Sequence, residues 1–154
     1  GPQRSPVDAP FAVLLIFRGT MNSDEDYDTL LKMRVVAVVG CSPKRGRPSN
    51  RVASYLMDVG YRVIPVNPGH EEILGERCYP ELKAIPEAVD VVNIFRRPEF
   101  VPEIVEAAIA VKAKGIWMQD GISDEKSAQR ARGCGLRVVM DDCFLRQHLS
   151  RYGR

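Results

Sequence analysis

The sequence predicts an α/β fold, a Rossmann-like open parallel five-stranded sheet with helices on both faces. Apolar runs recur at 35–39, 61–66, 89–95, 116–119 and 136–140. Runs without polar alternation suit parallel strands that are buried on both faces. Turn residues and apolar residues at helical spacing separate these runs, and strands alternating with helices predict right-handed crossovers within one sheet.

The first strand and the loop after it organise the chain. Val35–Val39 is apolar throughout, Gly40 begins a loop of small residues, prolines and cations, and helical spacing resumes from about Asn50, with Ser49 as the expected N-cap. Such a unit directs backbone N–H groups and the positive end of a helix at one point, where an anion is stabilised. The cations in or beside this loop, with no acid among them, are Lys44, Arg45, Arg47 and Arg51. We therefore expect a phosphate-bearing ligand here, against the plainer alternative of a structural loop with solvated charges.

We expect the strand order 3-2-1-4-5, in which the winding direction switches between the first and fourth strands. Ligands bind outside the carboxyl ends of the strands at such a switch. The 40–49 loop would then lie beside Gln119-Asp120-Gly121, with Asn67-Pro68 and Phe95-Arg96-Arg97 further along the same edge. Pro65 is unusual inside a strand and predicts a short strand or a bulge.

Composition predicts one domain at 21–154. The net charge of +2 gives no overall nucleic-acid footprint. We interpret residues 1–20 as a cloning remnant or upstream extension, because Gly1-Pro2 resembles a protease-cleavage scar and Met21 is a plausible start. The apolar run at 11–17 is too short to span a bilayer.

Neither cysteines nor histidines form a recognisable metal site. The 4 cysteines show no C-x-x-C spacing, and with the 2 histidines they make no zinc pattern. Scattered thiols favour a reducing, cytoplasmic location. A helix N-terminus and nearby cations lower a thiol pKa, so we hypothesise that Cys41 is the most reactive thiol, against the alternative of a small residue chosen for packing.

Two common nucleotide motifs are missing. The nicotinamide fingerprint needs G-x-G-x-x-G and an acid at the end of the second strand. Here Gly40 lacks the second and third glycines, and the second strand ends at Asn67. No G-x-x-x-x-G-K-[ST] occurs either. The missing glycines and the missing acid count against NAD, and the missing G-x-x-x-x-G-K-[ST] motif counts against a P-loop.

Several segments instead resemble the CoA-binding protein family, the stand-alone relative of the CoA-binding domain in succinyl-CoA synthetase and ADP-forming acyl-CoA synthetases. They are Gly40-Cys41-Ser42, Arg47-Pro48-Ser49, the Pro-Val-Asn-Pro element at 65–68, Phe95-Arg96-Arg97-Pro98, Trp117-Met118-Gln119 and Asp141-Asp142-Cys143. The resemblance runs from about Asp24 to Arg151. The chain departs from the family at position 41, usually alanine, and at position 142, often arginine.

The resemblance implies that CoA or acyl-CoA is the ligand. Its pyrophosphate would meet the N–H groups of 40–42, its adenosine end would lie near 67–68 and 95–97, and its pantetheine arm near 119–121. The implied binding residues are Gly40, Cys41, Ser42, Arg47, Pro48, Ser49, Asn67, Pro68, Phe95, Arg96, Arg97, Val101, Gln119 and Gly121.

We expect no catalysis. No carboxylate pair stands out, and a Cys143–His148 pair is weighed against the plainer interpretation of a surface histidine and a half-buried cysteine. The alternatives are a small acyl-CoA or NAD(P)-dependent enzyme and a regulatory subunit of a larger acyl-CoA synthetase. The expected partners are the small-molecule ligand and a second copy in a homodimer, with no nucleic acid and no membrane.

Overall fold

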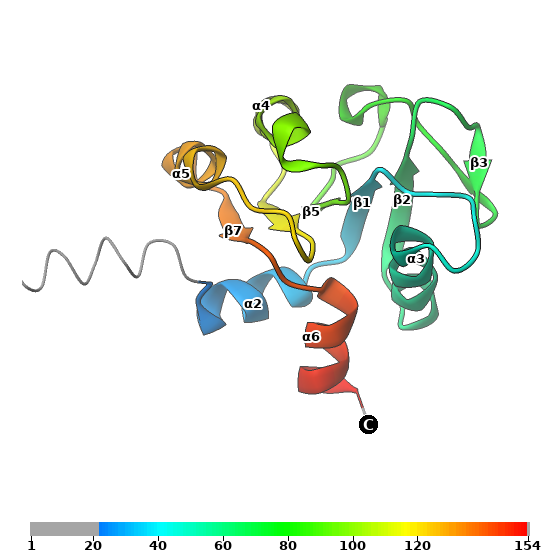
Figure 1. Ribbon diagram of the computed structural model, residues 1–154, viewed down its shortest axis with the longest axis horizontal. Coiled ribbons are helices and arrows are strands. Elements are labelled where there is room, and N and C mark those ends of the chain that lie inside the picture. The colour runs from blue at the N-terminus through cyan, green and yellow to red at the C-terminus, as the bar shows by residue number, and fades with distance from the viewer. Residues whose placement is uncertain (1–21, 154) are drawn as a thin grey trace, which may run out of the picture.

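The computed structural model of the protein describes residues 22–153 (Figure 1). The predicted extension at 1–20 and the predicted start at Met21 lie outside the described residues. Among the helices of the described part, none has the length and apolar character needed to cross a membrane.

The expected fold class is confirmed: five parallel strands form one sheet with helices on both faces (Figure 1). The strands are β1 (Val35–Val39), β2 (Arg62–Val66), β5 (Val91–Ile94), β6 (Gly115–Met118) and β7 (Arg137–Val139). The α-helices are α2 (Asp24–Leu31), α3 (Pro48–Asp58), α4 (Val101–Ala110), α5 (Glu125–Gly133) and α6 (Phe144–Tyr152). Between β2 and β5 lie a small hairpin, β3 (Glu72–Ile73) with β4 (Glu76–Arg77), and the 3₁₀ turn η1 (Leu82–Ala84); a second turn, η2 (Pro98–Phe100), precedes α4.

The expected strand order is wrong. The sheet runs β2-β1-β5-β6-β7, so the third long apolar run, β5, pairs with β1 instead of lying outside β2. The place outside β2 is taken by a single residue, Tyr79, which forms a parallel bridge with Val66. The expected order followed the dinucleotide-type arrangement, whereas an apolar run at 89–95 does not by itself specify which strand it pairs with. The winding direction consequently switches between β1 and β5.

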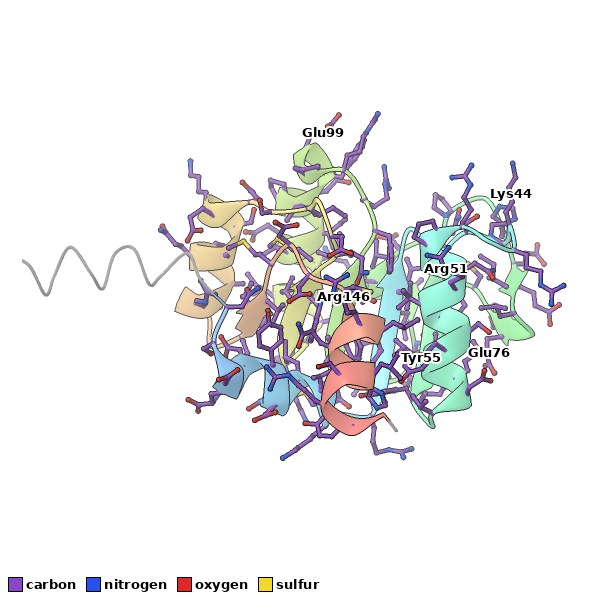
Figure 2. All side chains as sticks on the ribbon, turned by 60° about the horizontal axis from the view of Figure 1, so that its bottom comes forward. Lys44, Arg51, Tyr55, Glu76, Glu99 and Arg146 are labelled. Carbon is purple, nitrogen blue, oxygen red and sulfur yellow. The ribbon has the colours of Figure 1, made fainter. Side chains whose placement is uncertain are left out.

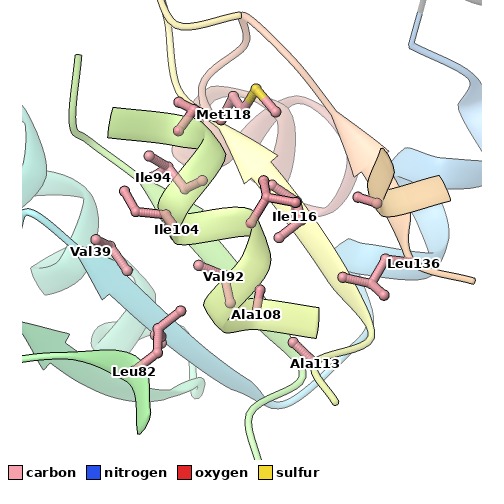
Figure 3. Packing of buried hydrophobic residues seen from close by; sticks show 14 of the residues in the cluster. Val39, Leu82, Val92, Ile94, Ile104, Ala108, Ala113, Ile116, Met118 and Leu136 are labelled. Carbon is pink, nitrogen blue, oxygen red and sulfur yellow. The ribbon is translucent and has the colours of Figure 1, made fainter. Parts of the chain in front are cut away.

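Two layers of helices bury the two faces of the sheet. On one face α4 and α5 cover a cluster in which Ile104 and Ala108 pack over the sheet residues Val92 and Ile116 (Figure 3). On the other face α2, α3 and α6 cover a second cluster, whose largest buried side chains are Trp117 and Phe144.

Pro65 fits because of its place in the sheet. Its C=O accepts from the Tyr79 N–H at 3.1 Å, on the side of β2 that faces away from β1. Since N–H and C=O of a strand residue point the same way, the N–H that proline lacks would face this outer side. The β1–β2 ladder therefore continues past Pro65 without a bulge, with Val38 beside it.

Candidate ligand-binding site

A cavity of about 760 Å³ opens at the carboxyl ends of β2, β1 and β5. This is the crevice beside the switch point, where open α/β sheets bind ligands. Four of the predicted binding residues line it, Gly40, Asn67, Pro68 and Arg96. The other lining residues are Val39, Val66, Pro80, Glu81, Leu82, Lys83, Glu103, Ile104, Glu106 and Ala107.

Gly40 is required at the floor of this cavity. Its φ is +86°, a conformation that side chains rarely adopt. A Cβ on Gly40 would lie 3.2 Å from the backbone carbonyl carbon and oxygen of Phe95 and 3.1 Å from Cδ of Arg96. The absent side chain therefore lets the end of β1 pass directly against the end of β5.

The N–H groups expected to face a pyrophosphate are already hydrogen-bonded within the chain. Those of Gly40 and Cys41 donate to the Val66 carbonyl, at 2.9 and 3.4 Å. The Ser42 N–H donates to Oγ of Ser49 at 2.9 Å. These bonds tie the loop to β2 and to α3. Because the three N–H groups are already bonded, the groups left to bind an anion are the N–H groups at the start of α3 and the cationic side chains of the loop.

The N-cap prediction for α3 is wrong by two residues. Arg47 occupies the N-cap position and Pro48 the first helical position, where a missing N–H costs nothing. Ser49 lies inside the first turn and is buried. The N–H groups of Ser49 and Asn50 belong to the first turn and so have no acceptor within the helix.

The expectation for Cys41 is also wrong. Its side chain is 0% exposed and packs in the cluster under α3 and α6. Burial, together with the nearby Cys78 thiol, raises the pKa of Cys41 to about 12. The loop follows the predicted path, but this side chain points into the core, so burial outweighs the helix terminus and the cations.

The segment after β5 delivers one cation to the cavity. The Arg96 guanidinium carbon lies 4.0 Å from the centre of the Phe100 ring, which holds the side chain beside Gly40. Arg97 is largely exposed and pairs loosely with Glu99, at 3.6 Å. Val101, the first residue of α4, is fully buried in the core and does not line the cavity. Phe95 packs against the hydrophobic cluster on the other face of the sheet.

Sequence reasoning missed ten of the fourteen residues that line the cavity. Glu81, Leu82 and Lys83 come from the irregular segment between β2 and β5, which has no periodicity that could have placed it. Ile104 and Ala107 belong to α4, whose helical spacing indicates a core-facing stripe. That stripe extends past the core to the cavity, and this extension carries no signal in the sequence.

The basic loop lies at the amino-terminal end of α3 and is exposed. Figure 2 shows Lys44 and Arg51 at this same end of the helix. Arg51 donates to the Gly46 carbonyl at 2.9 Å. Within residues 22–153, no acid forms an ion pair with the four cations of this loop, Lys44, Arg45, Arg47 and Arg51.

The turn after β6 is separated from the cavity. β5 lies between β1 and β6, so the 40–49 loop does not neighbour Gln119 as expected. The buried Gln119 Oε1 accepts from the Asn93 amide at 3.2 Å and from the Phe144 N–H at 3.3 Å. The Gly121 N–H donates to Oδ1 of Asp141 at 2.7 Å. Gln119 therefore binds the start of α6, and Gly121 binds Asp141 in the turn that precedes this helix.

The hydrogen bonds of Asp142 explain this closure. Its carboxylate accepts from the Tyr27 hydroxyl, from Arg146 at 2.7 Å, from Gln147 at 3.0 Å and from the Cys143 N–H at 2.8 Å. Arg146 in turn binds Asp120 at 2.8 Å. One buried carboxylate thus locks α2, the start of α6 and the β6 turn together.

The sequence of this chain is similar to that of known proteins and to a family model. Residues 34–148 match the model of the CoA binding domain. The uncharacterized protein YneT of Bacillus subtilis is 36% identical over 121 residues, 79% of this chain and 90% of that protein. The acetate–CoA ligase (ADP-forming) I of Archaeoglobus fulgidus is 40% identical over 127 residues, 76% of this chain but 18% of the ligase.

Solved structures agree with the sequence relatives. A hypothetical protein from Pyrococcus horikoshii superposes with a TM-score of 0.80 at 40% identity, covering 83% of this chain and 91% of that one. A dinucleotide-forming acetyl-coenzyme A synthetase of Ca. Korarchaeum cryptofilum gives 0.65 at 25% identity, covering 72% of this chain and 26% of the synthetase. With its model matched over most of the described residues, the chain belongs to the CoA binding domain family.

Proposed function

We propose that this protein binds CoA or acyl-CoA without catalysing a reaction, and that the ligand occupies the cavity at the ends of β2, β1 and β5. The observation that carries this proposal is the cavity at the switch point, where the Gly40 turn and the positioned Arg96 meet. Family membership supplies the class of ligand. The cavity volume of about 760 Å³ lies within the range of small-molecule sites, about 300–1,000 Å³.

The cavity and the basic loop divide the ligand between them. Apolar walls from Val39, Leu82 and Ile104 suit the flat adenine base, and Asn67 and Arg96 offer polar contacts beside it. The phosphates then lie toward α3, where first-turn N–H groups and the four loop cations stabilise negative charge. Binding through Arg47, Pro48 and Ser49 remains part of this proposal.

The groups that could act as nucleophiles support binding without catalysis. His148 Nδ1 is hydrogen-bonded with the Tyr55 hydroxyl at 2.7 Å, not with Cys143. Burial lowers the pKa of His148 and raises that of Cys41. Neither side chain lines the cavity. The four free thiols also suit the reducing cytoplasm in which we place the protein.

A regulatory role beside a larger acyl-CoA synthetase is the second candidate. The chain spans less than a fifth of the Archaeoglobus ligase that it matches. One relative is named as the alpha subunit of an ADP-forming acetate–CoA ligase of Pyrococcus furiosus. Copurification with a separate synthetase chain would favour this candidate.

Calorimetric titration tests the ligand. CoA and acetyl-CoA should bind, whereas NAD, NADP and ATP should bind much more weakly, and thermal unfolding should shift in the same order. Binding of NAD with none of CoA would reject the proposal. Chromatography of CoA and acetyl-CoA after long incubation should show both unchanged, and turnover would reject the non-catalytic assignment.

Arg47→Ala tests the basic loop. Losing one charge-assisted contact to phosphate, worth roughly 1.5–3 kcal/mol, should weaken CoA binding about 10- to 150-fold. Lys112→Asn is the control, because Lys112 is exposed at the end of α4 and asparagine tolerates its φ of +62°. Unchanged affinity in folded Arg47→Ala would mean that the loop cations are only solvated charges.

A further inference from the structure

Exposed apolar side chains gather at the amino-terminal end of the sheet, away from the cavity of the proposed function. Among the described residues, the large hydrophobic side chains that are exposed are Val59 at 41%, Leu149 at 49%, Tyr152 at 43% and Leu74 at 39%. The first three lie at the ends of α3 and α6, which pack against each other. We call Val59, Leu149 and Tyr152 the α3–α6 patch. Clustered apolar exposure of this kind marks an interaction site.

A second cavity, of about 270 Å³, opens within this patch. Its lining comes from the segments that precede β1 and β2 and from α6: Leu31, Lys32, Met33, Arg34, Val59, Gly60, Tyr61, His148 and Tyr152. The centres of the Tyr61 and Tyr152 rings lie 5.7 and 5.5 Å from that of His148, and the Tyr55 hydroxyl is hydrogen-bonded with Nδ1 of the imidazole at 2.7 Å. The cavity is thus a preformed aromatic socket that can hold one branched aliphatic side chain.

Charges of both signs surround the patch without partners. Lys32 and Arg34 line the socket, and Asp58 precedes Val59. Over residues 22–153 none of these three side chains forms an ion pair, although Arg62, Arg137 and Arg151 nearby all do. Under a two-fold axis such a rim is complementary to itself, because the cations of each copy meet the aspartate of the other.

The same electrostatics disfavour a small ion in the socket. α2, α3 and α6 all end here, at Leu31, Asp58 and Tyr152, and the partial negative charge of the helix carboxyl ends offsets the attraction of Lys32 and Arg34 for a small anion. Lys32 and Arg34 repel a cation. A protein surface that carries an apolar side chain and charges of both signs is complementary to the socket, to the cations Lys32 and Arg34, and to Asp58.

We propose that the α3–α6 patch binds a second copy of this chain in an isologous dimer. Leu149 of each copy enters the socket of the other, and Asp58 of each pairs with Lys32 or Arg34 of the other. The dimer leaves the cavity at the carboxyl ends of the strands open on both copies, so CoA binding and dimerisation are independent.

Sedimentation velocity over a wide concentration range tests the dimer. The native chain should pass from monomer to dimer as its concentration rises. Leu149→Asp should weaken association by about 100-fold or more, because symmetry removes two socket contacts and leaves two buried charges. Leu74→Asp is the matched control, another exposed leucine that lies on the β3–β4 hairpin, and should leave association unchanged. Circular dichroism confirms that both variants are folded.

A charge exchange tests the pairing itself. Asp58→Lys alone and Lys32→Glu/Arg34→Glu alone should each dimerise more weakly, whereas their mixture should form a heterodimer with both rim pairs restored. A structural effect of either change would not be repaired by mixing. A native chain that stays monomeric at the highest concentration reached, an equal effect of Leu74→Asp, or no heterodimer in the mixture would each overturn the proposal. CoA titration of the variants should match the native chain, so failure here leaves the proposed function standing.

Discussion

The turns after β1 and after β6 are both glycine-containing turns at the carboxyl edge of one sheet, yet they are built for different purposes. The β1 turn uses Gly40 to bring three strand ends together around an open cavity. The β6 turn is closed, because Gln119, Asp120 and Gly121 are each bound by the start of α6 or the residues around it. Similar turn chemistry in sequence therefore does not predict equal access, and the partners of the polar groups decide it.

The cations beside the two turns also differ in their partners. Arg96 beside the β1 turn is held by an aromatic ring, which leaves its charge available to a ligand. Arg146 beside the β6 turn is neutralised by Asp120 and Asp142. This difference supports the proposed ligand site on the β2–β1–β5 side of the edge, and four experiments test this division.

The largest effect is expected at Cys41. Burial raises the pKa of Cys41 to about 12, so the thiol is almost wholly protonated at pH 8, and the side chain is fully buried. Alkylation followed by mass spectrometry should therefore modify the exposed Cys134 at least about a thousandfold faster than Cys41. Equal rates would mean that the β1 turn opens and that its thiol faces the ligand side.

Asp142→Ala should show that the β6 turn serves the fold. Removing a carboxylate that binds Tyr27, Arg146 and Gln147 should lower the free energy of unfolding by about 3 kcal/mol, since each hydrogen bond to a charged group is worth roughly 1.5–3 kcal/mol. Urea denaturation measures this, with the exposed Glu99→Ala as the control. A large loss of CoA affinity in the folded variant would place the β6 turn in the ligand site.

Arg96 and Arg146 form a matched pair across the two turns. Arg96→Ala should weaken CoA binding about 10- to 150-fold through the loss of a charge-assisted contact. Arg146→Ala should leave the affinity within about twofold, because its guanidinium is already bound to two aspartates. Calorimetry on both variants decides, and a reversed order of effects would contradict the assignment of the site to the β1 side.

The smallest effect concerns Asp120. The Arg146 side chain, by hydrogen bond and charge, lowers the pKa of Asp120, against the opposing effect of burial. A lowered folded-state pKa stabilises the fold above the unfolded value of about 3.9, and the contribution is lost as pH falls through the folded value. Because this pair is about half exposed, Asp120→Asn should cost less than about 1 kcal/mol at neutral pH and nothing in strong acid. Unfolding curves at several pH values measure this, and a difference that grows toward low pH would refute the pairing.

Local physics in the sequence determined the fold class, the strands and the existence of the β1 turn. The apolar runs at 35–39, 61–66, 89–95, 116–119 and 136–140 predicted the buried parallel strands, and Gly40 predicts a tight turn without knowledge of its neighbours. The sequence predicted that Asn67 and Pro68, in the Pro-Val-Asn-Pro element, lie at the carboxyl edge of the sheet, and both residues line the cavity there. These features depend on interactions between residues close in the chain.

The tertiary structure decided the strand order and the availability of each group. Only the Tyr79 bridge shows that the place beside β2 is taken. Only packing shows that Cys41 faces the core, that Asp142 closes the β6 turn and that α4 lends Ile104 to the cavity. Each of these depends on which residues, distant in sequence, surround a side chain, and burial and hydrogen-bond partners, not residue type, then determine its chemistry.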